Sequence, residues 1–175
     1  MEKNIFQHAL TFILLIMAQA VIFNHIVLFG IAIPFIFIYF IIKLPVSTNP
    51  SNVIFWSFLL GTVMDIFQDT PGMCGLACTC IGALRMPLLR IFIPREDDII
   101  HSAPSIRTFG LGTFVRYVAT VAAIFCTLVF TIEAFTFFHL GLLLQRIVAS
   151  TLLTSLLLVA IESISRKKRS GEKRL

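Results

Sequence analysis

The sequence predicts an all-α membrane protein, a polytopic bundle of six transmembrane helices. The chain of 175 residues is 58% hydrophobic and only 13% charged, whereas soluble domains are about 45–50% apolar and about 25% charged. Apolar runs recur along the chain at about 20 residues, the length that crosses the hydrocarbon core of a bilayer. The eighteen Phe residues also indicate a surface that faces lipid.

Six apolar segments are expected to form the spans. They cover about residues 5–23, 26–42, 53–67, 73–93, 109–132 and 135–161. The third segment is the shortest, so we expect it to tilt or to stop below the outer surface. The bundle then occupies residues 1–165, and residues 166–175 form a basic cytoplasmic tail. Asp69-Thr70-Pro71-Gly72, between the third and fourth segments, is a strong turn signal.

The distribution of Lys and Arg predicts an inner (cytoplasmic) membrane protein with both termini in the cytoplasm. The three outer connections contain neither residue type, whereas six of the fourteen basic residues lie in the tail. The other inner basic residues are Lys3, Lys43, Arg95 and Arg107. Cytoplasmic loops carry the excess of Lys and Arg. The net charge of +5 therefore reflects topology and anionic lipid, and it does not indicate nucleic-acid binding.

The first span has a competing interpretation as a cleavable signal peptide. Lys3, the apolar run and Ala18-Gln19-Ala20 resemble such a segment. We favour an uncleaved helix, because the apolar run continues past the alanines.

Asp65 and Arg146 are the notable charges inside the spans. At a rise of about 1.5 Å per residue, they lie about 18 Å and about 22 Å above the inner ends of the third and sixth spans. An unpaired Arg in lipid costs at least about 2.5–3.5 kcal/mol, so a partner is expected. We predict a structural ion pair between them, in preference to a substrate or proton site.

Three further basic residues are expected at the inner face: Arg85, Arg90 and Arg95. The first two, and Arg116, have long stems that reach the interface. Glu162, at the inner end of the sixth span, is a candidate partner for Arg85, Arg90 or Arg116, but we favour interfacial anchoring of these arginines.

Small residues predict close helix packing at Gly61, Gly72, Gly75 and Gly82. In the fourth span, small residues recur every four positions, which lets two helix backbones approach. The same face can instead receive a foreign single-span helix, and the spacing does not decide between the two.

No enzyme motif, cofactor site or metal site is predicted. The chain has no Gly-x-Ser-x-Gly, no His-Glu-x-x-His and no phosphate-binding Gly-x-x-x-x-Gly-Lys. The four cysteines form no Cys-x-x-Cys pair, and they are expected to pack as small side chains.

Several motifs, in order, resemble the rod shape-determining protein MreD family. Residues 23–30 look like its first hairpin, and residues 60–73, with Gly61, Asp65 and Gly72, look like its central motif. Residues 83–90 with Pro94-Arg95 continue the match, and residues 144–151 are similar to its last span. The resemblance covers nearly the whole chain.

The resemblance implies a non-enzymatic scaffold of the bacterial cell-elongation machinery, which shapes the rod cell and its peptidoglycan wall. Its implied partners are an MreC-like single-span protein, MreB, RodA and a penicillin-binding transpeptidase. The implied fold resembles the substrate-binding subunits of energy-coupling-factor vitamin transporters. Such a subunit is therefore the main alternative function, and a polar, aromatic-lined outer pocket would favour it. An unknown membrane enzyme is the other alternative.

Overall fold

The computed structural model has helices as its only regular elements in the parts that it describes. These parts are residues 2–21, 32–92, 104–134 and 140–171, with side chains from Phe12 to Ile164 except 107, 108 and 140. The long helices are α1 (Glu2–Val21), α3 (Pro50–Gln68), α4 (Met73–Phe92), α6 (Leu111–Glu133) and α7 (Leu140–Gly171). Two short helices are α2 (Ile38–Lys43) and α5 (Ile106–Phe109).

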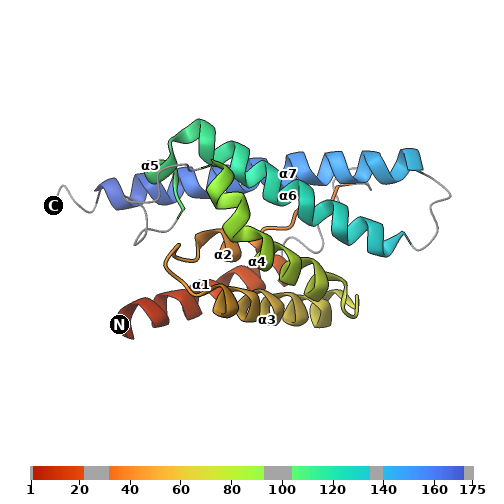
Figure 1. The fold of residues 1–175 in the computed structure, drawn as a ribbon, viewed down its shortest axis with the longest axis horizontal. Coiled ribbons are helices and arrows are strands. Elements are labelled where there is room, and N and C mark those ends of the chain that lie inside the picture. Colours follow the sequence, from red (N-terminus) through yellow and green to blue (C-terminus); the bar gives the residue numbers. More distant parts are fainter. Residues whose placement is uncertain (1, 22–31, 93–103, 135–139, 172–175) are drawn as a thin grey trace.

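The long helices pack in two groups joined by α4 (Figure 1). Helices α3 and α4 form an antiparallel hairpin, and α1 lies against α3. Helices α6 and α7 form the second pair, and α4 contacts α6. Helix α2 lies between the two groups (Figure 1). The α3–α4 hairpin is therefore the part of the fold that links both halves.

Four helices are long and apolar enough to cross a membrane. They are Pro50–Gln68, Met73–Phe92, Leu111–Glu133 and Gly141–Ile164, and they correspond to the expected third, fourth, fifth and sixth spans. The expected first span corresponds to α1, whose described apolar part, Phe12–Val21, is shorter than these four. The third span is longer than expected because α3 begins at Pro50, a residue that suits the first turn of a helix.

The second expected span is not one continuous helix, and this prediction was wrong. Helix α2 has only six residues, and the chain from Ile33 to Phe37 before it is not helical. Pro34 gives the local reason, because proline lacks an N–H group and pushes the preceding residue out of the helical region. The expected residues 26–31 lie outside the described ranges.

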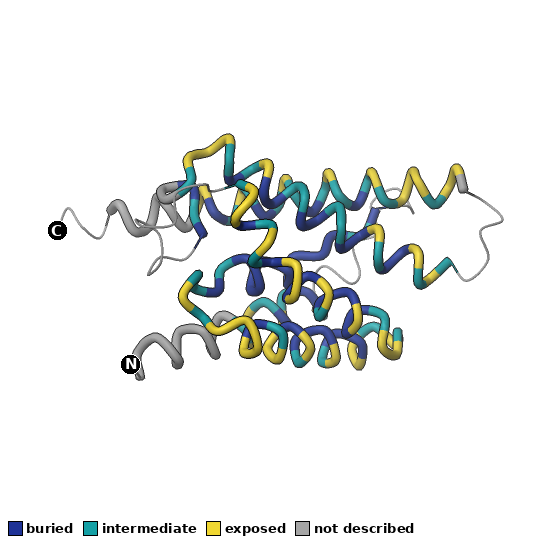
Figure 2. Tube along the Cα trace, viewed as in Figure 1, coloured by how far each residue is buried: buried dark blue, intermediate teal, exposed yellow. Residues whose placement is uncertain are grey.

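Exposed positions run along the outer faces of the helices (Figure 2), and many of them carry large apolar side chains. In an 18-residue apolar stretch of Gly141–Ile164 only 22% of the residues are buried, and in one of Pro50–Gln68 only 33%. The exposed side chains include Phe55, Phe58, Ile66, Leu144 and Leu152. Soluble monomers rarely expose contiguous apolar surface of this kind. The described helices therefore have the exterior of a membrane protein.

Phenylalanine also builds the interior, which the expectation of a lipid-facing role missed. The rings of Phe35 and Phe125 lie 5.1 Å apart, and those of Phe37 and Phe125 lie 5.6 Å apart. Phe130 joins the cluster at 6.1 Å from Phe35. All four are buried. Their edge-to-face geometry favours aromatic packing, so the segment before α2 is fixed to α6.

Candidate functional site

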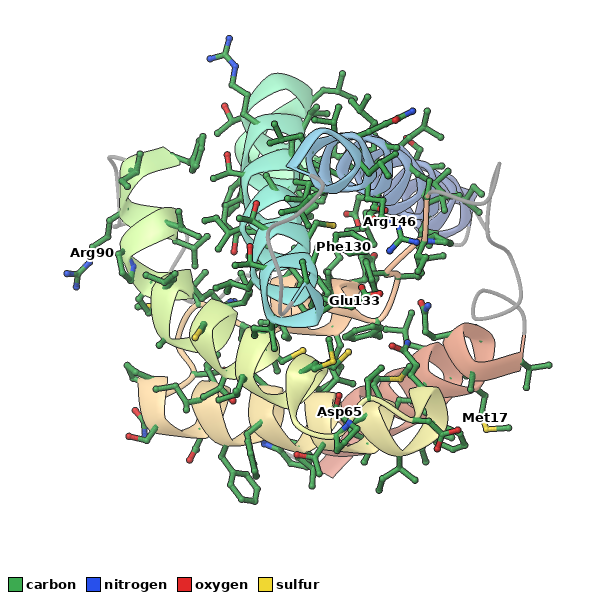
Figure 3. All side chains as sticks on the ribbon, turned by 90° about the vertical axis from the view of Figure 1, so that its right-hand side faces the viewer. Met17, Asp65, Arg90, Phe130, Glu133 and Arg146 are labelled. Atoms are coloured by element: carbon green, nitrogen blue, oxygen red, sulfur yellow. The ribbon has the colours of Figure 1, made fainter. Side chains whose placement is uncertain are left out.

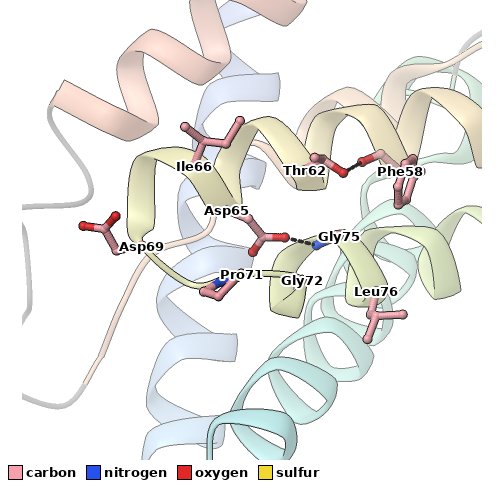
Figure 4. Close-up of a pocket in the computed structure, with 9 residues that line it drawn as sticks. All are labelled: Phe58, Thr62, Asp65, Ile66, Asp69, Pro71, Gly72, Gly75 and Leu76. Atoms are coloured by element: carbon pink, nitrogen blue, oxygen red, sulfur yellow. Dashed lines mark hydrogen bonds between the residues drawn. The ribbon is translucent and has the colours of Figure 1, made fainter.

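Asp65 binds the first turn of α4 with both oxygens of its carboxylate. Oδ1 accepts a hydrogen bond from the backbone N–H of Cys74 at 2.8 Å, and Oδ2 accepts one from Gly75 at 2.8 Å (Figure 4). The Thr70 hydroxyl donates a third, at 3.2 Å to Oδ1. The first N–H groups of a helix have no partner within it, and the helix dipole favours an anion there. Asp65, only 6% exposed, therefore caps α4 from the preceding helix.

Glycine lets α3 and α4 approach closely at this cap. A Cβ atom on Gly61 would lie 2.5 Å from the Cys74 carbonyl oxygen and 2.7 Å from the Gly75 Cα. One on Gly75 would lie 3.1 Å from Asp65 Oδ2, and one on Gly82 would lie 2.7 Å from Ser57 Oγ. The structure confirms the packing role predicted for these three residues.

Gly72 has a different role from the one predicted. A Cβ there would meet nothing within 4 Å, but its φ is +85°. Such a backbone conformation favours glycine. Asp69, three residues earlier, also has a left-handed backbone conformation, with φ at 52°, and it ends α3. Gly72 therefore makes the turn between α3 and α4, and it does not serve helix packing.

The predicted ion pair between Asp65 and Arg146 is absent, so that prediction was wrong. Arg146 instead contacts Glu133, with 3.5 Å between Nη1 and Oε1. Figure 3 shows Arg146 beside Glu133 and apart from Asp65. Equal depth in the membrane did not bring the two side chains together, because the backbone N–H groups of α4 satisfy Asp65 locally. Arg146, 46% exposed at its side chain, reaches the end of α6 instead.

Three polar side chains hold the non-helical segment before α2. Gln19 donates to the Pro34 carbonyl and accepts from the Ile36 N–H, both at 2.8 Å. The hydroxyls of Ser150 and Thr154 accept from the N–H groups of Ile33 and Phe35, both at 3.1 Å. All three side chains are buried. Helices α1 and α7 thus replace the hydrogen bonds that the broken helix lacks.

Sequence reasoning missed this arrangement. The sequence pattern placed Gln19 only in a candidate signal-peptide segment, and it assigned no polar contact to Ser150 or Thr154. The available signal was the cost of a polar side chain in lipid, because such a residue faces the protein interior and needs a partner.

Arg85 is buried, so its side chain does not extend to the inner interface. This differs from the prediction. It is 1% exposed, and its Nη2 donates to the Leu44 carbonyl at the end of α2. A cation is favoured at a helix C-terminus. Its Nε and Nη1 atoms have no hydrogen-bond partner within the described ranges. Arg90 is exposed, in agreement with an interfacial role, and Arg95 lies outside the described residues.

Glu162 pairs with Lys43, and not with any of the candidate arginines Arg85, Arg90 and Arg116. The Lys43 ammonium lies 2.8 Å from Glu162 Oε2. The Tyr39 hydroxyl donates to the same oxygen at 2.6 Å. Glu162 is only 5% exposed. Its carboxylate has lost most of its contact with solvent, so its charge needs these partners. The cluster joins α2 to α7.

A groove of about 740 Å³ opens beside the Asp65 cap (Figure 4). Its lining includes the small residues Thr62, Gly72 and Gly75 and the apolar side chains Phe58 and Leu76. Within the same described ranges, no three His, Cys, Asp or Glu side chains converge as metal ligands. The groove is thus an apolar depression with acidic groups at one end.

Comparison with family models, curated proteins and solved structures finds no match to this chain. The resemblance to the MreD family therefore depends on the motifs themselves. Three of their residues, Gly61, Asp65 and Gly72, meet in the α3–α4 hairpin as close contact, cap and turn.

Proposed function

We propose that this protein is a non-enzymatic inner-membrane scaffold of the bacterial cell-elongation machinery that binds an MreC-like single-span partner. The observation that carries the proposal is the use of the central motif. Gly61, Asp65 and Gly72 build one structural unit. This is expected if the motif maintains the hairpin and does not form a reaction centre. A scaffold needs a rigid surface, and the capped hairpin provides one.

The exposed apolar helices support contacts inside the bilayer. Between Gly141 and Ile164, α7 leaves most of its surface uncovered by the rest of the described protein. Partner helices and lipid can both occupy such a surface. We propose that RodA and a penicillin-binding transpeptidase meet the bundle there, and that MreB meets its cytoplasmic face. Peptidoglycan synthesis would thereby be tied to the cytoplasmic filament.

Affinity purification in mild detergent tests the proposal. The full chain carries a tag and is expressed with the MreC-like protein encoded in the same genome. We expect that protein to be recovered in a defined ratio. Recovery of an ATPase module together with a small ligand would overturn the scaffold proposal.

A substrate-binding subunit of a vitamin transporter is the second candidate. The broken second span favours it, because transporter binding sites are typically formed by discontinuous helices near the middle of the membrane. Here the break is buried, and side chains bond the Pro34 carbonyl and the N–H groups of Phe35 and Ile36. Mass spectrometry of the purified protein after denaturation decides: a stoichiometric small molecule supports the transporter subunit.

A further inference from the structure

The groove beside the Asp65 cap follows one face of α3. Phe58, Thr62 and Asp65 of α3, and Asp69 at its C-cap, recur at intervals of three or four. Residues at this spacing lie on one face of a helix. From Phe58 to Asp69 the groove extends over three turns, about 16 Å at a rise of about 1.5 Å per residue. This is the shape that the side chains of a second helix fill, at positions i, i+3, i+4 and i+7.

Small residues permit a close approach along this groove. Thr62, Gly72 and Gly75 leave the space between the larger side chains Phe58 and Leu76. Two membrane helices associate where small residues let their backbones come near. The Thr62 hydroxyl bonds to the Phe58 carbonyl in its own helix, so it already has a partner. The lining therefore presents an apolar surface to an incoming helix.

The negative charge of Asp69, at one end of the groove, has no Lys or Arg paired with it in the described parts of the chain. The Asp65 carboxylate is offset by the N–H groups of α4, whereas Asp69 is exposed. The outer connections predicted from the sequence contain no Lys or Arg at all. An occupant that brings a cation to this end would therefore be favoured.

We propose that this groove receives the transmembrane helix of the single-span partner, with a Lys or Arg of that helix beside Asp69. The inference depends on the proposed function, and it assigns the partner a place. Anionic phospholipid fits less well, because its net negative headgroup would lie near Asp69 and like charges repel. A second copy of this chain fits less well too, because its outer connections lack a cation.

Site-specific cross-linking tests the position of the partner. A photoreactive residue replaces Leu76 in the groove or, as a matched control, Leu144 on α7. The two side chains are 60% and 61% exposed, and only Leu76 lines the groove. We expect the MreC-like partner to cross-link at least fivefold more from position 76. Equal or greater yield from position 144, or a phospholipid adduct at position 76, would overturn the groove assignment.

Charge removal tests the contact at Asp69. Asn also tolerates a left-handed backbone, so Asp69→Asn removes the charge without disturbing the end of α3. We expect about tenfold lower recovery of the partner at equal abundance of the variant in the membrane. Glu133→Gln, which changes an exposed acid outside the groove, should recover the partner at wild-type yield.

Replacement of the partner's outer Lys or Arg by Ala completes the test. Combined with Asp69→Asn it should cause no further loss, because the two changes remove the same contact. Additive losses, or full recovery with Asp69→Asn, would exclude the contact. If the wild-type chain recovers the partner and every groove variant behaves like it, only the groove fails. If the wild-type chain recovers no partner, the proposed function fails with it.

Discussion

At the residue scale, several buried polar side chains in this protein form hydrogen bonds at the ends and breaks of helices. Asp65 binds two N–H groups of α4, and Arg85 binds a carbonyl at the end of α2. Gln19 binds both a donor and an acceptor in the segment before α2. In lipid each unsatisfied backbone group costs several kcal/mol. These side chains therefore stabilise the bundle where its helices do not satisfy themselves.

Asp65→Ala should destabilise the protein strongly. The change leaves the N–H groups of Cys74 and Gly75 without their partner, and each buried unsatisfied donor costs about 1–3 kcal/mol. We expect a loss of about 2–4 kcal/mol in the free energy of unfolding in detergent, with lower abundance in the membrane. Denaturant titration followed by circular dichroism measures the loss.

Arg146→Ala is the control for this prediction, because an ion pair between Asp65 and Arg146 would make both variants equally unstable. The exposed contact between Arg146 and Glu133 should contribute about 0–1 kcal/mol. Equal losses in the two variants would contradict the capping role of Asp65.

Gly61→Ala should also destabilise the hairpin. The added methyl group would lie 2.5 Å from the Cys74 carbonyl oxygen, and overpacking of this kind costs about 1–3 kcal/mol. Gly112→Ala in α6 is the matched control, because its Cβ would meet nothing within 4 Å. Thermal unfolding in detergent should show a lower Tm for the first variant and an unchanged or higher Tm for the second. A similar decrease in both would indicate that the close approach at Gly61 is unimportant.

At the scale of elements, hydropathy predicted the helices and missed the break. Helices α3, α4, α6 and α7 lie close to the expected segments, since each is a long apolar run. The second segment is just as apolar, but apolarity does not report whether a buried backbone is helical. Pro34 was the local signal. The partners of this segment on α7 lie 117 and 119 residues away, so no window along the sequence shows them.

The candidate site was predictable only in part, for a related reason. The three packing glycines and the turn at Asp69–Gly72 follow from local spacing and turn chemistry. The partner of Asp65 could not be predicted in this way, because depth along a helix does not give the direction in which a side chain points. The carboxylate faces α4, which begins only a few residues later, and helix capping was the principle that applied.

Gln19→Leu tests the polar support of the broken segment. Leucine has a similar size but leaves the Pro34 carbonyl and the Ile36 N–H unsatisfied, at about 1–3 kcal/mol each. We expect a loss of about 2–5 kcal/mol in the free energy of unfolding in detergent. Gln145→Leu, an exposed change on α7, should remain within about 0.5 kcal/mol of wild type. If Gln19→Leu were as stable as wild type, the bonds from Gln19 would not hold the segment.

At the scale of the whole molecule, apolar side chains fill the interior and also cover much of the outside, whereas most of the hydrogen-bonded polar side chains lie inside. The described surface therefore has few directional groups, such as Asp69 and the pair of Glu133 and Arg146. Interactions with partner helices are therefore expected to depend on shape and on these few charges. Which side of the membrane each charge occupies then decides what it can meet.

The charge pattern predicts that α3 begins at the cytoplasmic side and ends at the outer side. Cysteine labelling tests this in a Cys80→Ser background, because Cys80 is the exposed one of the four native cysteines. Ser47→Cys and Pro71→Cys place exposed thiols just before and just after α3. A membrane-impermeant maleimide should label position 71 in intact spheroplasts and position 47 only after lysis, because α3 separates the two thiols by one span. The reverse pattern would invert the bundle, place Asp69 in the cytoplasm and remove the partner's outer cation from reach of the groove.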